Sequence, residues 1–153
     1  MPRAIAPDEI PALYEEFAQA ARNARAAGID GVELHAASGY LVHQFLDTAS
    51  NQRSDAYGGS AENRCRFAIG VLQAMADAIG AGRVGLRISP GNTFNGMAAD
   101  EPEANFAPLL QAAEGRKRAY VHIMNMNLPE FDVLEMVRKY WSGPVLNNNG
   151  LTG

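Results

Sequence analysis

Hydrophobic residues along the chain follow two periods in turn. Four stretches have apolar residues at the spacing of an amphipathic helix, at residues 7–28, 61–80, 103–113 and 129–140. A short, largely apolar run typical of a strand follows each stretch, at residues 32–35, 83–89, 120–124 and 144–148. Helices that alternate with strands in this way indicate parallel strands joined by right-handed crossover connections.

The predicted strands have one apolar face and one polar face. In the strand at 32–35, Glu33 and His35 share the face opposite the apolar one, and in the strand at 83–89 the polar face carries Arg87. A parallel sheet with helices on both faces would be apolar on both. In a (β/α) barrel, by contrast, only the outward face meets helices, and inward residues near the carboxyl ends of the strands line the active site. We therefore predict an α/β fold: a partial TIM (β/α) barrel of four consecutive parallel β-strands alternating with helices.

The length of the chain limits how much of a barrel it can form. A complete (β/α)₈ barrel needs about 250 residues, whereas this chain has 153 residues. No linker or low-complexity segment interrupts the pattern. We expect a single domain over residues 1–153, with the architecture of a half-barrel.

Charge and composition narrow the class of partner. The net charge of −4 argues against nucleic acid and anionic membranes as main partners. No apolar run approaches the roughly 20 residues of a membrane span, and the start of the sequence lacks the apolar core of a signal peptide. Cys65 is the only cysteine, which fits a reducing compartment and excludes an internal disulfide. We therefore expect a cytoplasmic protein. We also expect no metal site, because the sequence has neither His-Glu-x-x-His nor clustered carboxylates.

Candidate chemistry gathers where the first predicted strand ends. His35, Ser38 and Tyr40 lie within six positions, around a glycine. A lone histidine is more often structural than catalytic, and we interpret His43 and His122 as structural. Ser38 does not lie in a G-x-S-x-G turn, and no G-x-G-x-x-G loop follows a predicted strand, so a serine hydrolase and a doubly wound dinucleotide fold are disfavoured.

Two further features have both a structural and a functional interpretation. Arg87 is a cation on a buried-looking strand, and it needs a carboxylate, a phosphate or an electron-rich ligand. Glu33, one strand away, could meet that need in a purely structural ion pair. The run from Asn147 to Gly150 is either a turn or a loop whose backbone approaches a ligand closely.

Several stretches resemble the Old Yellow Enzyme-like, FMN-dependent ene reductases. The longest is GVELHAASGYLVHQFLDTASNQRSDAYGGSAENRCRF, and VGLRISP with TFN, YVHIM and GPVLNNNGLT follow it in order. The resemblance extends from about Pro2 to Gly153. It implies that the four strands match the fourth to seventh strands of an eight-stranded, FMN-binding barrel, and that the other strands of that barrel lie outside this sequence.

The resemblance implies a reaction and a set of substrate-binding residues. The family reduces activated alkenes, such as enones and nitroalkenes, with FMN that NADPH or NADH recharges. His35 matches the histidine that hydrogen-bonds the substrate oxygen, and Tyr40 matches the proton donor to the α-carbon. Ser38 stands where the family usually has Asn or His, and it is shorter than either.

The resemblance also implies cofactor-binding residues. Arg87 matches the arginine beside the pyrimidine edge of the flavin, and His35 is expected to contact the cofactor as well. Asn149 and Gly150 fall where the family has its phosphate-contacting loop.

The short length keeps a second function open. The alternative to an ene reductase is a non-catalytic, truncated half-barrel that acts as an assembly or binding module; a flavin-free barrel enzyme is disfavoured by the long family-like loop. Four parallel strands cannot close a barrel, so the strands at 32–35 and 145–148 would be open edges. We therefore expect a homo-oligomer that associates through these edges, with weak or absent binding of FMN by the chain alone.

Overall fold

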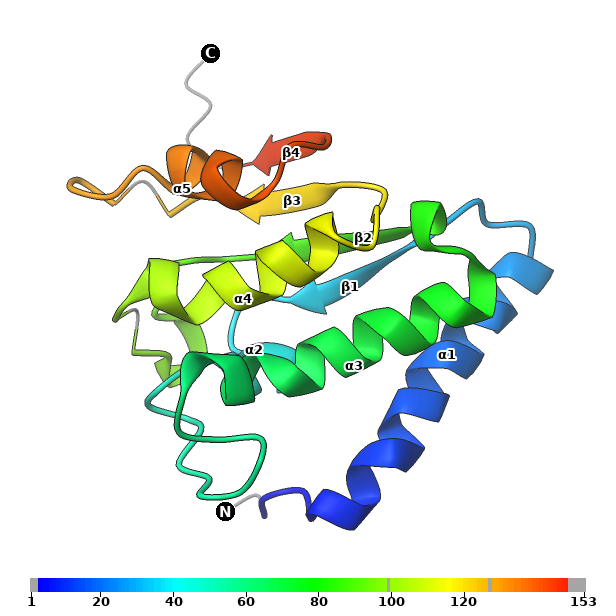
Figure 1. Cartoon of the computed structure of the whole chain (residues 1–153), viewed down its shortest axis with the longest axis horizontal. Helices are drawn as coiled ribbons and strands as arrows, with labels where there is room; N and C mark the ends of the chain where they lie inside the picture. Colours follow the sequence, from blue (N-terminus) through cyan, green and yellow to red (C-terminus); the bar gives the residue numbers. More distant parts are fainter. Residues whose placement is uncertain (1–2, 99, 127, 149–153) are drawn as a thin grey trace.

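The computed structural model describes residues 3–98, 100–126 and 128–148, and this part of the chain contains one parallel sheet. The strands lie side by side in chain order (Figure 1). They are β1 (Val32–Ala36), β2 (Val84–Ile88), β3 (Val121–Met124) and β4 (Val145–Asn148). All three neighbouring pairs are parallel, which confirms the predicted fold class.

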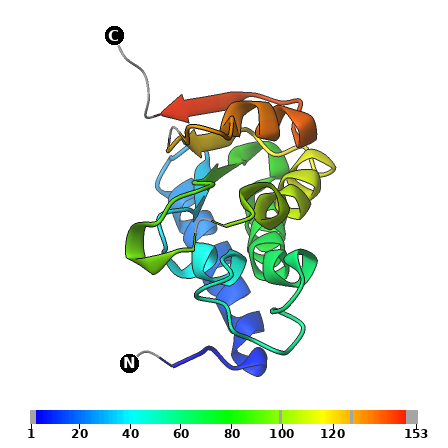
Figure 2. The same ribbon diagram turned by 90° about the vertical axis from the view of Figure 1, so that its left-hand side faces the viewer.

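Helices follow the strands in alternation. They are α1 (Ile10–Ala26), α2 (Leu41–Leu46), α3 (Ala61–Ile79), α4 (Pro102–Glu114) and α5 (Val133–Tyr140), with single 3₁₀ turns at Pro7–Glu9, Ala81–Arg83 and Phe94–Gly96. The helix α3 packs against α1 and α4, and α4 packs against α5. The four longer helices thus form a layer on one side of the sheet, as Figure 2 shows from the end at which the strands terminate.

The sheet has the two different faces that the alternation predicts. Seven side chains on the helix side are at most 1% exposed, whereas Val32, Val145 and Asn147 on the same side are only partly buried; the seven are Leu34, Ala36, Val84, Leu86, Ile88, Val121 and Ile123. Register pairing puts His35, Arg87, His122 and Leu146 in one row on the opposite face. Leu146 is 49% exposed there. The polar face is therefore the inner face of an open half-barrel.

Helix boundaries agree with the sequence where a capping residue is visible in it. The Ser60 side chain accepts a hydrogen bond from the Asn63 N–H at 3.4 Å and begins α3 as predicted. The last helix begins later than the expected residue 129, because the Asp132 carboxylate accepts the N–H groups of Leu134 and Glu135 at 2.8 and 3.0 Å. The short helix α2 was not predicted.

Candidate active site

His35 and Arg87 meet at the carboxyl ends of neighbouring strands. They are register partners on β1 and β2, and both side chains lie on the open face. His35 is exposed and Arg87 is half-buried. The next residue of each strand, Ala36 or Ile88, points into the helix layer and is fully buried. His35 and Arg87 are thus the last inward residues of two adjacent strands, at the carboxyl ends where the sequence predicts the active site.

A tight turn brings Tyr40 back to His35. The ring centroids of the two side chains are 5.5 Å apart, with the rings tilted by 43°, and Tyr40 is 55% exposed. The turn needs Gly39, which has a φ of 72° and lies against the loop after β2. A Cβ at Gly39 would come within 2.7 Å of the Phe94 carbonyl oxygen, so a side chain is excluded there. The imidazole and the phenol can therefore act on one small molecule.

The charge state of His35 is set by its neighbours. Partial desolvation of the ring and the Arg87 guanidinium lower the pKa of His35, while the Glu33 carboxylate acts in the opposite direction. The net shift is downward from an ordinary value near 6.5, so the imidazole is neutral at pH 7. A neutral imidazole still carries one N–H, which it can donate to an oxygen atom.

Ser38 has all of its polar atoms engaged within the chain. Its N–H donates to the Ser89 Oγ at 2.9 Å, and its carbonyl oxygen accepts from the Asn95 Nδ2 at 2.9 Å. Its hydroxyl donates to the Sδ of Met124 at 3.4 Å, and Asn92 contacts the same sulfur at 3.9 Å. Ser38 is buried and has a φ of 58°. The hydroxyl is thus directed toward β3, a contact that sequence reasoning missed because it joins residues 86 positions apart.

Arg87 has no hydrogen-bond partner for its Nε, which is buried. The alternative in which Glu33 pairs with Arg87 is wrong, because the Glu33 Oε2 lies 2.9 Å from the Nδ1 of His122 instead. A buried donor without a partner is costly unless a ligand satisfies it. Arg118 also has a buried Nε without a partner, but Arg87 lies beside His35 on the open face, where it fits an electron-rich group such as the edge of a flavin ring.

The two residues predicted to contact a phosphate, Asn149 and Gly150, lie outside the described residues. The two asparagines before them are described, and they close β4. The Oδ1 atoms of Asn147 and Asn148 are buried without a hydrogen-bond partner. These two buried oxygen atoms at the end of β4 therefore receive no hydrogen bond from the described residues.

The buried His43 side chain holds the turn between β1 and α2 by a hydrogen bond to Gly39. Its Nδ1 accepts the Gly39 N–H at 2.9 Å, and the ring is 3% exposed against Phe106. Burial lowers the pKa of His43 to about 4, with Asp47 opposing the shift. The interpretation of His43 as a structural residue fits this geometry, and its contact is what fixes the residue before Tyr40.

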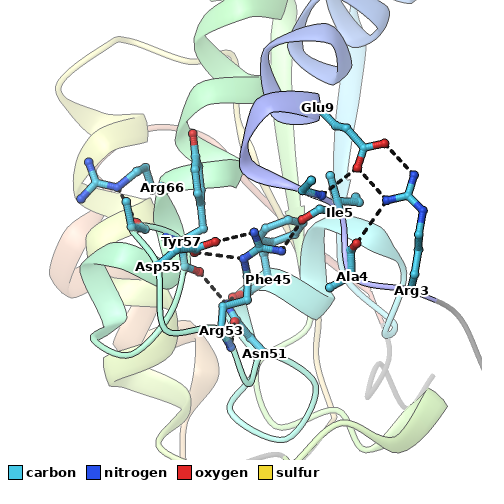
Figure 3. A network of polar contacts seen from close by, with 12 residues as sticks. Arg3, Ala4, Ile5, Glu9, Phe45, Asn51, Arg53, Asp55, Tyr57 and Arg66 are labelled. Carbon is cyan, nitrogen blue, oxygen red and sulfur yellow. Dashed lines mark hydrogen bonds and ion pairs between the residues drawn. The ribbon is translucent and has the colours of Figure 1, made fainter.

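The family-like segment after α2 is a structural clamp (Figure 3). Arg53 donates to the Ile5 carbonyl oxygen at 2.7 Å and pairs with Asp55 at 2.6 Å. The Asn51 side chain donates to the Phe45 carbonyl oxygen at 2.6 Å. These contacts tie the loop to α2 and to the segment before α1, so the loop braces the helix that directly follows Tyr40.

A cavity of about 140 Å³ adjoins this clamp, lined by residues that include Leu41, Phe45 and Arg53. It does not include His35 or Arg87, which lie on the open face of the sheet. Among the described residues there is no cluster of three or more His, Cys, Asp or Glu side chains that could hold a metal ion. Nor does this part of the chain contain a helix long and apolar enough to cross a membrane.

The four parallel strands and the row of polar side chains on their open face define the class as part of a (β/α) barrel. The sequence matches the NADH:flavin oxidoreductase / NADH oxidase family over residues 1–152, and the chain belongs to this family. The resemblance to Old Yellow Enzyme-like proteins is thereby confirmed.

Individual relatives agree with this membership. The chain is 52% identical over 124 residues to a probable flavin mononucleotide-dependent alkene reductase of Leishmania infantum, covering 81% of this chain and 34% of that protein. It is 47% identical over 127 residues to a chanoclavine-I aldehyde reductase of Penicillium roqueforti, covering 83% and 34%. The chain thus spans about a third of the length of these curated relatives.

Solved structures agree as well. An old yellow enzyme homologue from Zymomonas mobilis superimposes with a TM-score of 0.93 at 32% identity, over 98% of this chain and 44% of that one. Morphinone reductase in complex with tetrahydroNAD gives a TM-score of 0.90 at 40% identity, over 99% and 42%. The four strands therefore have the arrangement of part of a barrel in these enzymes.

Proposed function

We propose that this chain carries the substrate-facing part of an FMN-dependent ene reductase, which reduces activated alkenes such as enones and nitroalkenes. The observation that supports this most is the grouping of His35, Tyr40 and Arg87 on one open face at the strand ends. The proposal includes the assignment of the four strands to the fourth to seventh positions of the barrel. Because the chain spans about a third of its curated relatives, activity belongs to a completed barrel.

His35 and Tyr40 divide the acid chemistry between them. Bound FMN would supply a hydride to the β-carbon of the alkene. Negative charge then develops on the carbonyl or nitro oxygen, where the His35 N–H donates a hydrogen bond that is worth about 2–4 kcal/mol by comparison with oxyanion holes. The Tyr40 hydroxyl gives its proton to the α-carbon. Ser38 is the proposed second contact to the substrate.

Arg87 would hold the cofactor through charge. Its half-buried guanidinium has a buried Nε without a partner, which suits the electron-rich pyrimidine edge of a flavin. A cation at that edge stabilises the reduced, anionic form of the ring. Asn149 and Gly150 are the proposed contacts to the phosphate, and His35 is a further contact to the ring.

A nicotinamide is the proposed source of electrons. The tetrahydroNAD complex of morphinone reductase supports a nicotinamide site in the family, and we propose NADPH or NADH as the reductant. We further propose a cytoplasmic location, on the basis of the single cysteine, which is buried and free.

The open edges of the sheet support a second candidate function. The outer edges of β1 and β4 have no neighbour among the described strands. A non-catalytic half-barrel that assembles through these edges is the alternative, and in either case we propose a single domain that forms a homo-oligomer.

An absorption spectrum of the purified chain separates the two functions. Flavin bands near one equivalent per chain, or submicromolar FMN affinity by fluorescence titration, support the enzyme. Absence of bound flavin, with no affinity on titration, contradicts a working site in the chain alone and favours the assembly module.

A further inference from the structure

The inner face of the sheet carries a hydrogen bond between Glu33 and His122 in an unexpected place. Glu33 is the register partner of Gly85, one pair before Arg87 on β2. By strand spacing and rise, the Glu33 Cα lies roughly 8 Å from that of Arg87 but roughly 12 Å from that of His122 on β3. The carboxylate nevertheless contacts His122, at 2.9 Å, rather than the nearer cation.

A gap in β2 permits this long reach. Gly85 has no side chain, and the Tyr120 ring fills the space above it; a Cβ at Gly85 would lie 2.4 Å from the Tyr120 Cζ. Burial and the neighbouring Glu33 carboxylate raise the pKa of Tyr120. The Glu33 side chain therefore reaches across β2, and its carboxylate contacts the side chains of Tyr120, directly before β3, and His122 on β3.

The consequence for Arg87 is an unpaired cation. A carboxylate and a guanidinium at this separation would normally pair, because the charge-assisted hydrogen bond is among the strong ones. Here no described carboxylate forms an ion pair with Arg87, and its buried Nε lacks a partner. Two side chains at β3 hold Glu33 away from Arg87: His122, whose Nδ1 lies 2.9 Å from the carboxylate, and Tyr120, which also hydrogen-bonds it.

We propose that His122 is a positioning residue: it holds Glu33 on β3 and thereby keeps Arg87 free for an electron-rich ligand. The ligand assignment rests on the proposed function, in which Arg87 faces the flavin. The pairing itself concerns only residues of this chain. His122 thus acts on the cofactor site through Glu33 and Arg87.

The pKa of His35 reports whether Glu33 pairs with His122 or with Arg87, and it can be measured without flavin. Arg87 lowers the pKa of His35 and Glu33 raises it. If Glu33 moved onto Arg87, the cation beside His35 would be neutralised and this pKa would rise. The titratable or charged groups that face the row are Glu33, Tyr40, His43, Arg87, Tyr120 and His122; β4 contributes Leu146 and Asn148, which do not titrate.

The first experiment titrates His35 by NMR in the flavin-free chain. In His122→Leu we expect the pKa of His35 to rise, and the Arg87 Nε–H to exchange more slowly, because Glu33 pairs with Arg87. Adding Glu33→Gln to that variant should reverse both changes. His122→Asn keeps an N–H near the position of Nδ1 and should behave like the unmodified chain.

Two results would overturn the proposal. One is a folded His122→Leu chain in which the His35 titration and the Arg87 exchange are unchanged. The other is a double variant that keeps the changes of His122→Leu. If His122→Leu does not fold, Glu33→Gln alone decides: the proposal requires the Arg87 Nε–H exchange to stay as it is, and faster exchange would mean that Glu33 already pairs with Arg87 in solution.

The second experiment measures FMN affinity by fluorescence quenching in a barrel completed with the remaining strands. We expect His122→Leu to weaken binding about tenfold, the scale of one charge-assisted hydrogen bond, and the added Glu33→Gln to restore it. An unchanged FMN affinity in His122→Leu contradicts the part of the proposal in which His122 keeps Arg87 free for its ligand. If Arg87→Ala also leaves the affinity unchanged, the proposed function fails, while the flavin-free titration still decides the internal pairing.

Discussion

Ser38 is a residue at which the family resemblance implies a departure from the usual Asn or His. Its left-handed backbone is a conformation that asparagine adopts more readily than most residues, and its hydroxyl is occupied by the Met124 sulfur. A weak hydrogen bond to a thioether is easily exchanged for one to a substrate oxygen. The position is therefore suited to the longer amide side chain.

Replacing Ser38 by asparagine tests this reading. Ser38→Asn extends the donor toward the substrate oxygen without straining the backbone, so we expect an enone to bind several-fold more tightly to a flavin-loaded form, since one hydrogen bond is worth about 1 kcal/mol. Spectral titration of the flavin with the enone measures this. Ser38→Ala is the control, and weaker binding in Ser38→Asn would mean that no carbonyl oxygen lies near residue 38.

Tyr40 should affect one half of the reaction only. Tyr40→Phe removes the proton donor with little change in volume, so reoxidation of the flavin by an enone should slow by about 10²–10⁴-fold. Reduction of the flavin by the nicotinamide should be unaffected. Stopped-flow measurement of the two halves checks this, and equal slowing of both would show that Tyr40 is not a selective proton donor.

Arg87 should matter to the cofactor through its fork of donors as well as its charge. Arg87→Ala is expected to weaken FMN binding about tenfold or more and to make the flavin harder to reduce. Arg87→Lys keeps the charge but not the planar fork, so it should recover only part of the affinity. Fluorescence titration and potentiometry provide the two readouts; unchanged values in Arg87→Ala would make the residue structural.

At the scale of elements, the strands and longer helices were predictable because local signals specify them. The Ser60 cap and the alternating apolar positions are visible in the sequence. The helix α2 was missed because six residues are fewer than two turns, too short for a periodic signal. The contact between Glu33 and His122 was missed because it depends on the lack of a side chain at Gly85 in the strand between them, which no local pattern reveals.

The turn between β1 and α2 should give the fold a sensitivity to acid. His43 is neutral when folded, with a pKa of about 4, but titrates near 6.5 when unfolded. Between these values the unfolded chain binds more protons, so stability falls as the pH is lowered from 6.5 toward 4, by up to about 3 kcal/mol.

Denaturant unfolding at several pH values measures this loss. His43→Asn keeps an acceptor for the Gly39 N–H and removes the titration, so its stability should change less over the same interval. A pH dependence identical in the two chains would show that His43 is not its source.

At the scale of the whole molecule, half of the surface of the sheet lacks a covering layer. Two edges are unpaired and the open face includes Leu146, which is 49% exposed. Two copies related by a twofold axis could pair both edges and enclose the open faces. The same surface in a longer relative would meet the remaining strands of the barrel.

We therefore predict a dimer or higher oligomer for the soluble, folded chain. Light scattering at low micromolar concentration measures the mass. Leu146→Lys puts a charge on the open face and should shift the distribution toward the monomer. A well-dispersed monomer with cooperative unfolding in the unmodified chain would rule out this assembly.

The clamp around Arg53 has a consequence for how such proteins can change over time. It connects residues 5, 45, 51 and 55 within one contiguous stretch, and the turn that bears Tyr40 is supported by residues of that same stretch. His35, Tyr40 and their support from His43 are thus inherited together, although Ser89, Asn95 and Met124 hold Ser38 from outside this stretch. Recombination at the boundaries of this stretch would transfer His35 and Tyr40 together to another half-barrel, and the recipient would need to supply the contacts that Ser89, Asn95 and Met124 make here.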